Sequence, residues 1–270
     1  MLQVNNISYQ VQGRNLLQQV NAVIRPGAFT ALMGSNGAGK STLLKIISGE
    51  LKPSAGTVTW QGKALKDWDQ KELAKTRAVL RQQYAMQLPF SVFDIISMGR
   101  YPHFRNKLSS QCREVIAKVA TYTGVEHLMK RDYLTLSGGE QQRVQLARVL
   151  AQVWDTPSDH KLVLLDEPVS ALDIHYQHQL LSLVKGLSHA NFTVVAVLHD
   201  LNLAMQYADD VLLLKQGKTI RFAAKEEALS ADPIYETFGV KAALHQAEDY
   251  PHSFITVCPV QQQYQHWGNG

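Results

Sequence analysis

The sequence predicts an α/β fold built on a parallel β-sheet, with an antiparallel opening and an inserted helical subdomain. Short apolar runs, "LVLL" at 162–165 and "TVVAVL" at 193–198, alternate with segments of helical periodicity. Runs of this length are typical of strands that are buried on both faces of a parallel sheet. With 45% hydrophobic and 19% charged residues over 270 positions, the chain can bury the core that such a fold needs.

The amino-terminal part of the chain predicts strands, a turn and one helix. Residues 2–11 alternate well enough for an edge strand of an antiparallel sheet, and a Pro-Gly turn at 26–27 precedes a short apolar strand. From Lys40 onwards, apolar residues follow helical spacing until Gly49, which ends the helix. Residues 54–65 then look like a β-hairpin.

A helical segment interrupts this core. Periodicity over 91–131 leads into a helix that starts after Ser137, and an apolar stripe with Val144 and Leu150 marks its buried face. The core resumes after a loop at 154–161 and contains a helix from about His175. We expect the core at 1–83 and 154–225, the helical subdomain at 84–153 and a C-terminal extension, frayed at its end, at 226–270.

Charge and cysteine usage exclude several classes of protein. The net charge of +4 comes from scattered Lys and Arg, so there is no footprint for nucleic acid. Cys112 and Cys258 stand alone, which predicts reduced thiols and neither a disulfide nor zinc. The amino end has no secretory pattern, and the apolar runs fall short of the ~18 residues that a spanning helix needs. We therefore expect a cytosolic chain whose membrane role, if any, goes through a partner.

The stretch "GSNGAGKS" fits the phosphate-loop pattern G-x-x-x-x-G-K-[ST] and lies between a predicted strand and a predicted helix. The alternative, a glycine-rich turn without a ligand, requires a chance match of roughly one in a hundred at average residue usage. Backbone N–H groups would wrap a β-phosphate, Lys40 would reach the β and γ oxygens, and the Ser41 hydroxyl would ligate Mg²⁺. The predicted nucleotide-binding residues are Gly34, Ser35, Asn36, Gly37, Ala38, Gly39, Lys40, Ser41 and Thr42.

Polar side chains follow two predicted strands and one shorter apolar run. "LVLLDEP" ends in Asp166 and Glu167, and His199 follows "TVVAVL" in the same position. Taken alone, each is also compatible with a turn or a capping residue. Carboxyl ends of parallel strands bind ligands, so beside a phosphate loop Asp166 is predicted to hold Mg²⁺ and Glu167 to deprotonate the attacking water. Gln82, or Gln83 in another loop register, could reach the metal or the water.

The stretch "LTLSGGEQQR" predicts a second anion site. Ser137 and Glu140 have the spacing of a capping box at a helix start. The capping box leaves Gly138 and Gly139 unexplained, since each costs about 1 kcal/mol in a helix relative to Ala. Glycines there let another group approach the N–H donors of a helix N-terminus, which carries a partial positive charge and therefore favours an anion.

These motifs, with "SALD" at 170–173 and in this order, resemble the ATP-binding subunit of ABC transporters over residues 2 to 225. The resemblance implies a P-loop NTPase with a RecA-like sheet, binding ATP and Mg²⁺, that works as a head-to-tail homodimer. In such a dimer, Ser137, Gly138 and Gly139 grip the γ-phosphate of the ATP that the other copy holds. By the same resemblance, Gln82 is the Q-loop residue and a metal ligand, Glu167 is the general base, Asp173 is the D-loop residue and His199 is the switch histidine.

The adenine contact departs from the family pattern. The family usually stacks adenine on an aromatic side chain just before the Gly-Arg of the first hairpin. By alignment to Gly13 and Arg14, this place holds Val11, and Tyr9 lies two residues earlier. The sequence leaves Tyr9 or no residue at all as the stacking partner.

A finer resemblance concerns cargo. "MGRYPH" at 98–103 and the tail "PHSFITV" look like the subfamily that serves importers of iron chelates, haem and cobalamin. The 154–161 loop and the tail point most to haem importers of Gram-negative bacteria. The resemblance then implies two permease subunits and, indirectly, a periplasmic haem-binding protein as partners, with no nucleic acid. The implied location is the cytoplasmic face of the bacterial inner membrane, as a peripheral protein.

Two other classes compete with the importer subunit. A soluble ABC-type ATPase acting on ribosomes or DNA usually has two cassettes, a long coiled coil or a basic arm, and the sequence shows none of these. A regulatory P-loop protein without turnover would lack Glu167 or His199, and both are present. Within the importer class, ferric siderophores and cobalamin are the alternatives to haem.

Overall fold

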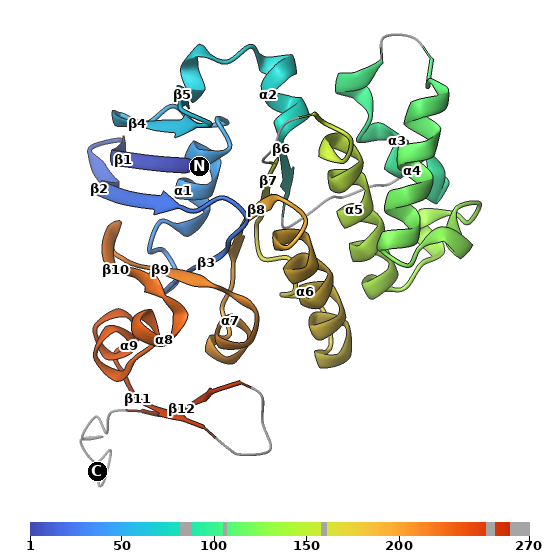
Figure 1. The fold of residues 1–270 in the computed structure, drawn as a ribbon. Helices are drawn as coiled ribbons and strands as arrows, with labels where there is room; N and C mark the ends of the chain where they lie inside the picture. Colours follow the sequence, from blue (N-terminus) through green and yellow to red (C-terminus); the bar gives the residue numbers. More distant parts are fainter. Residues whose placement is uncertain (82–87, 105–106, 158–160, 247–251, 260–270) are drawn as a thin grey trace, which may run out of the picture.

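A computed structural model describes residues 1–81, 88–104, 107–157, 161–246 and 252–259. It confirms the predicted α/β class. A central sheet lies between an antiparallel sheet and α1 on one face and a set of helices on the other, and a small hairpin stands at the carboxyl end (Figure 1). Among these described residues no helix combines the length and the apolar character needed to cross a bilayer.

The antiparallel sheet has the strand order β2 (Arg14–Ile24), β1 (Leu2–Val11), β4 (Ala55–Trp60), β5 (Lys63–Ala64). The predicted hairpin at 54–65 is confirmed as β4 and β5. The prediction of an edge strand at 2–11 is wrong, because β1 pairs with β2 on one side and β4 on the other. Alternation in sequence shows that one face of a strand is buried, not where in the sheet the strand lies.

The central sheet has six strands in the order β10 (Lys218–Ala224), β9 (Asp210–Lys215), β3 (Phe29–Gly34), β8 (Phe192–Val197), β7 (Lys161–Leu165), β6 (Arg77–Leu80). Neighbouring pairs from β9 to β6 are parallel, and β10 closes one edge in the antiparallel sense. The carboxyl ends of β3, β7 and β8 therefore meet at one edge of the sheet, where ligands bind in open α/β folds.

Strand β7 shows why its sequence is an unbroken apolar run. Leu162 and Leu164 belong to the core on the side of α1 (Lys40–Ile47), together with the buried face of the antiparallel sheet. Val163 and Leu165 belong to the other core, under α5 (Gly138–Val153), α6 (Ile174–Ser188) and α7 (Leu201–Tyr207). Both faces of the strand are buried away from solvent, so no polar residue alternates with the apolar ones.

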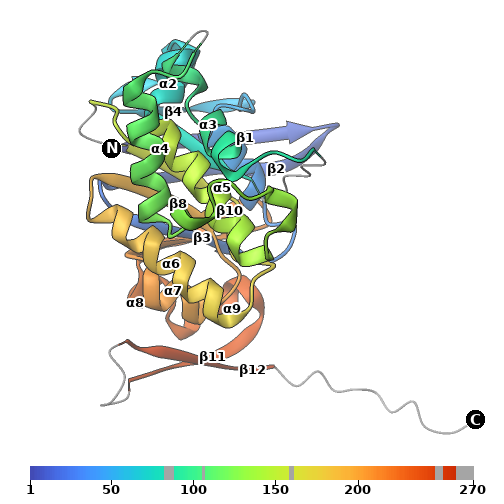
Figure 2. The same cartoon turned by 90° about the vertical axis from the view of Figure 1, so that its right-hand side faces the viewer.

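The helical region groups α3 (Val92–Met98), α4 (Ser110–Tyr122) and α5 (Figures 1 and 2), and α5 packs against β6 at the edge of the sheet. Short 3₁₀ turns link or follow them, at η2 (Tyr101–His103), η3 (Glu126–Leu128) and η4 (Tyr133–Thr135). Before this region, η1 (Leu65–Asp67) leads into α2 (Gln70–Thr76), which packs on α5 and is capped by the side chain of Asp69.

Two segments that the sequence associates with cargo are joined by a buried ion pair. The Arg100 side chain, 1% exposed, donates from Nη1 to Asp155 Oδ1 at 2.7 Å and from Nη2 to Asp155 Oδ2 at 3.1 Å. His103 Nε2 lies 2.7 Å from the carbonyl oxygen of Gln152. Arg100 and His103 come from the "MGRYPH" stretch, so within this chain these two side chains fasten the end of α3 to the end of α5.

The carboxyl-terminal part contains α8 (Lys225–Ala228), α9 (Ala231–Phe238) and a hairpin of β11 (Val240–His245) and β12 (Phe254–Pro259). The predicted frayed tail lies outside the described residues. The hairpin is attached to the body through Asn202 on α7. Ile255 N donates to Asn202 Oδ1 at 2.7 Å, and Asn202 Nδ2 donates to Ile255 O at 3.2 Å, while the Ile255 side chain enters the core.

Replacing Asn202 by Ala is expected to loosen the hairpin without unfolding the body. An unsatisfied buried backbone group costs about 1–3 kcal/mol, so the amide of Ile255 should lose roughly tenfold or more of its hydrogen-exchange protection. Asn202→Asp keeps the acceptor and should lose less. Unchanged protection in Asn202→Ala would show that the hairpin is held without this side-chain hydrogen bond.

Candidate active site at the carboxyl edge of the sheet

The phosphate loop connects β3 to α1, and a side chain would clash at two of its glycines. Gly34 has φ +152°, and a Cβ there would lie 2.2 Å from the carbonyl oxygen of Leu214 on neighbouring β9. Gly39 has φ +102°, and its Cβ would meet the Leu17 side chain at 2.7 Å. Gly37 also has a positive φ, at +76°, but nothing lies within 4 Å of its Cβ position. The loop is thus pressed against β2 and β9 at its ends and open in its middle.

The start of α1 is an uncapped helix N-terminus with a cation beside it. Gly39 occupies the N-cap position and makes no side-chain cap. Lys40 is 6% exposed, and its Nζ donates to Gly34 O at 2.8 Å and Ser35 O at 3.0 Å. Burial lowers the pKa of Lys40, while the charges of Glu167 and Asp166 oppose that lowering. Free helix N–H groups and a buried ammonium are the donors that a nucleotide phosphate requires, so this loop fits ATP.

The predicted metal ligands Ser41 and Asp166 lie together, although 125 positions separate them. Ser41 Oγ donates to Asp166 Oδ1 at 3.2 Å, and Asp166 N donates to Leu80 O on β6. Burial raises the pKa of Asp166, the hydrogen bond from Ser41 lowers it, and the neighbouring charge of Glu167 raises it again. A hydroxyl and a partly desolvated carboxylate are the oxygen ligands that Mg²⁺ uses beside a phosphate, so the residues present fit this ion.

Glu167 and His199 meet at the ends of the adjacent strands β7 and β8. His199 Nε2 and Glu167 Oε1 are 2.8 Å apart, with the two side chains 42% and 18% exposed. Glu167 also has φ +50°, a left-handed conformation that is uncommon for a residue with a side chain. Such strain costs about 1–3 kcal/mol and clusters at functional sites. The contact places this carboxylate directly against the imidazole of His199.

The other predicted nucleotide-binding residues range from buried to exposed. Ala38 is buried and its carbonyl oxygen accepts from Gly217 N at 3.0 Å, whereas Asn36 is exposed. Ser35 and Thr42 are half-buried. The predicted Q-loop residue Gln82, and its neighbour Gln83, lie outside the described residues. Tyr9, the one candidate for stacking on adenine, packs against the core, and Val11, at the place where the family has an aromatic residue, is 41% exposed.

The start of α5 is confirmed as a capping box. Ser137 N donates to Glu140 Oε2 at 2.8 Å, and Glu140 N donates to Ser137 Oγ at 3.4 Å. Ser137 donates to the Glu140 carboxylate from its backbone N and also from Oγ, at 2.9 Å, and these two hydrogen bonds lower the pKa of Glu140. Gly138 is exposed, and a Cβ added to it would meet no atom within 4 Å. Nothing in the described part of this chain therefore explains why Gly138 lacks a side chain.

Gly139 differs from its neighbour, which corrects the joint explanation of the two glycines. Gly139 is buried, and an added Cβ would lie 2.8 Å from Cδ1 and from Cγ of Tyr176. The group that approaches it is thus an aromatic ring of the same chain. Asp173, the predicted D-loop residue, is exposed and caps α6 by accepting from Tyr176 N at 3.1 Å.

Two residues at this junction were not predicted from the sequence. Tyr176 meets Gly139 from α6, and Gln142 Nε2 donates at 2.7 Å to the carbonyl oxygen of Pro168, directly after Glu167. Both contacts join segments more than 25 positions apart, so no local spacing reveals them. In Figure 1, α1 and α5 lie on opposite sides of β7 and β8, so the two predicted anion sites are separate within one subunit.

Comparison with known proteins decides the family. A family model described as ABC transporter matches residues 17–170. The chain belongs to the ABC transporter family. Its P-loop NTPase fold is confirmed by a solved structure of a metal-chelate type ABC transporter in an inward-facing conformation, with a TM-score of 0.82 and 30% identity over 95% of this chain and 96% of that one. Because the chain belongs to this family, ATP is its ligand and ATP hydrolysis is its activity.

Curated relatives of this ABC transporter chain are similar over most of their length. The Hemin import ATP-binding protein HmuV of Gloeobacter violaceus is 46% identical over 242 residues, covering 89% of this chain and 88% of that protein. The protein of the same name from Escherichia coli O157:H7 is 43% identical over 240 residues, covering 88% and 92%. A dimeric bacterial ABC transporter cassette matches with a TM-score of 0.71 and 28% identity, over 83% of this chain and 99% of that one.

Proposed function

We propose that this chain hydrolyses ATP in a head-to-tail homodimer and thereby powers import of haem through a membrane permease. The observation that carries the proposal is the Glu167–His199 contact of 2.8 Å beside the Ser41–Asp166 contact of 3.2 Å. A base with an orienting partner and a pair of metal ligands, placed beside a phosphate loop, are the parts that transfer of a phosphoryl group to water requires.

Each residue of the site then has a role in binding phosphate, in holding Mg²⁺ or in taking up a proton. The loop amides and Lys40 bind the phosphates of ATP in the same subunit. Ser41, Asp166 and Gln82 would hold Mg²⁺, which supplies positive charge against the phosphate oxygens. Glu167 takes the proton of the attacking water through its carboxylate. His199 orients Glu167, since its ring nitrogen lies within hydrogen-bond distance of that carboxylate, and as the switch histidine it is assigned to the γ-phosphate.

A second copy completes the site. The exposed position of Gly138 leaves the N-terminus of α5 accessible to a group outside the subunit, and the capping box occupies the N–H groups of Ser137 and Glu140 only. We assign Ser137, Gly138 and Gly139 to the γ-phosphate of the partner's ATP, with Asp173 at the seam between the copies. The dimeric cassette among the structural relatives supports a dimer of two such subunits.

The cargo follows from the relatives rather than from the site. The matched curated proteins are named as hemin import ATP-binding proteins, which favours haem over a ferric siderophore or cobalamin. Such a subunit works with two permease subunits at the cytoplasmic face of the bacterial inner membrane, and a periplasmic haem-binding protein delivers the cargo on the other side.

The proposal is tested by the ATPase activity of the complex with the permease encoded beside it, reconstituted in lipid. We expect stimulation by a haem-loaded periplasmic binding protein and none by one loaded with a ferric siderophore or cobalamin. Stimulation only by the protein loaded with a ferric siderophore, or only by the one loaded with cobalamin, would make that compound the cargo instead of haem. Indifference to all three proteins would contradict the importer role and leave only the ATP chemistry.

A further inference from the structure

We propose that Tyr176 is a positioning residue that fixes the start of α5 relative to Asp173, and that its ring is the reason residue 139 is a glycine. The inference rests on the proposed function in one respect, the assignment of the start of α5 and of Asp173 to the dimer seam. Gly138 and Gly139 would then be required for different reasons. Gly138 leaves room for a group outside the subunit, and Gly139 leaves room for Tyr176 inside it.

The contact between Gly139 and Tyr176 is too close for any side chain. An added Cβ would lie 2.8 Å from Cδ1, 2.8 Å from Cγ and 3.1 Å from Cδ2 of the ring. Real Cβ atoms essentially never approach other carbon atoms to less than 3.0 Å, so an alanine at 139 would have to displace the ring or the first turn of α5. These atoms belong to the rigid base of the side chain, which cannot swing away as a flexible end can.

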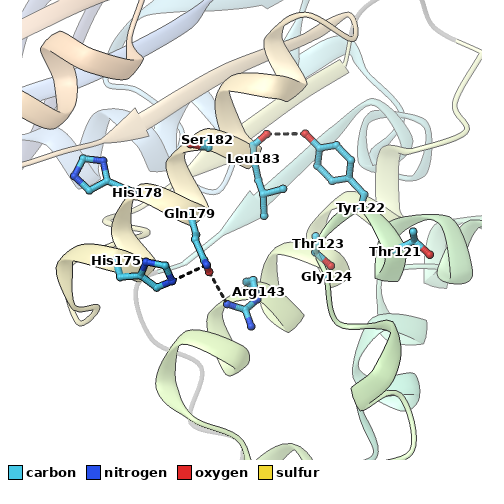
Figure 3. Close-up of a pocket in the computed structure, with 10 residues that line it drawn as sticks. All are labelled: Thr121, Tyr122, Thr123, Gly124, Arg143, His175, His178, Gln179, Ser182 and Leu183. Carbon is cyan, nitrogen blue, oxygen red and sulfur yellow. Dashed lines mark hydrogen bonds between the residues drawn. The ribbon is translucent and has the colours of Figure 1, made fainter. Parts of the chain in front are cut away.

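Tyr176 meets α5 at a second point one turn further on. The Arg143 guanidinium lies over the ring, 5.5 Å from its centroid, in a cation–π contact. Arg143 Nη1 also donates to Gln179 Oε1 at 3.2 Å, and Gln179 Nε2 is 2.8 Å from His175 Nε2. Figure 3 shows this chain of contacts crossing from Arg143 on α5 to Gln179 and His175 on α6. The ring is therefore held against α5 along a full turn.

The same residue is tied to the predicted D-loop. Tyr176 N donates to Asp173 Oδ1 at 3.1 Å, so the carboxylate of Asp173 and the ring of Tyr176 belong to one capped first turn of α6. The bond from Gln142 to the Pro168 carbonyl oxygen, 2.7 Å, joins α5 to the segment after Glu167. A displacement of the ring thus changes the distance between the start of α5 and Asp173, the two elements that face the partner.

A small displacement matters because a misplacement of about 1 Å costs on the order of 100-fold in rate. Tyr176 acts through the start of α5 and touches no reacting atom. Replacing Tyr176 by Ala should therefore leave ATP binding to the monomer unchanged and raise the ATP concentration needed for dimer formation. A residue needed only for folding would weaken monomer binding and dimer formation together.

The test is a pair of double-mutant cycles in a Glu167→Gln background, which is designed to keep ATP bound. One cycle combines Gly139→Ala with Tyr176→Ala, and the matched control combines Gly138→Ala with Tyr176→Ala. Two quantities are measured: the ATP concentration for half-maximal dimer formation, and the hydrogen-exchange rate of the first turn of α5. Tyr176→Phe, which keeps the ring, serves as the conservative variant.

We expect Gly139→Ala to raise the half-maximal ATP concentration by about tenfold with Tyr176 present and by less than about threefold with Tyr176→Ala, because contacting residues are non-additive. Gly138→Ala should have the same effect in both backgrounds, and Tyr176→Phe should behave like the parent. Equal effects of Gly139→Ala in both backgrounds would overturn the proposal. If the parent forms no ATP-dependent dimer, the proposed function fails, while the exchange rates of the same cycles still decide the role of Tyr176.

Discussion

Replacing Glu167 by Gln is expected to lower steady-state ATP hydrolysis by about 10²–10⁴-fold, the range that general acid–base groups contribute, while an ATP-bound dimer persists. The amide keeps the shape of the side chain and can still pair with His199, but it cannot accept the proton of the attacking water. Phosphate release from the reconstituted complex measures the loss, and size-exclusion chromatography with ATP measures the dimer.

A matched control separates the base from carboxylates in general. Glu114 is exposed on α4 and pairs with Lys118 at 2.7 Å, far from the phosphate loop in sequence. Glu114→Gln should hydrolyse ATP at the parental rate, because an exposed i,i+4 pair contributes only about 0.3–0.5 kcal/mol to stability. If Glu167→Gln retained more than a tenth of the parental turnover, Glu167 would not be the base.

Replacing Gly138 by Asp is expected to reduce turnover on the order of 100-fold or more and to leave ATP binding to the monomer intact. The added side chain finds open space in its own subunit, where no atom lies within 4 Å of the Cβ position. In the proposed dimer it places a carboxylate against the γ-phosphate of the partner's ATP, and like charges repel. Binding of a fluorescent ATP analogue to the isolated subunit and phosphate release from the complex measure the two effects.

Mixing variants tests whether that site is shared between copies. A Lys40→Ala subunit has a damaged phosphate loop, and a Gly138→Asp subunit has a damaged α5 start. In a head-to-tail pair of the two, one ATP site contains both defects and the other contains neither. The mixture should therefore form ATP-dependent dimers that neither variant forms alone. A mixture no better than its components would mean that each subunit uses its own α5.

Some features of the fold and the site can be predicted from the sequence, and others cannot. The phosphate loop is predictable because the pattern from Gly34 to Ser41 is local, and so is the capping box of Ser137 and Glu140. The position of β1 inside its sheet was not predictable, because its pairing with β4 depends on residues more than 40 positions away. The strand end beside the phosphate loop predicted Glu167 as the base, whereas the family resemblance supplied the role of His199 as the switch histidine.

Spacing along the chain was therefore sufficient to identify the fold class, the phosphate loop and the chemistry of the strand ends, because each depends on neighbouring residues. Packing decided the rest. The 3.2 Å contact of Ser41 with Asp166, the pair of Glu167 with His199 and the ring of Tyr176 on Gly139 all join segments brought together by strand order and helix packing. Two adjacent glycines look alike in sequence, and only the neighbours that pack around them reveal that one faces solvent and the other a tyrosine.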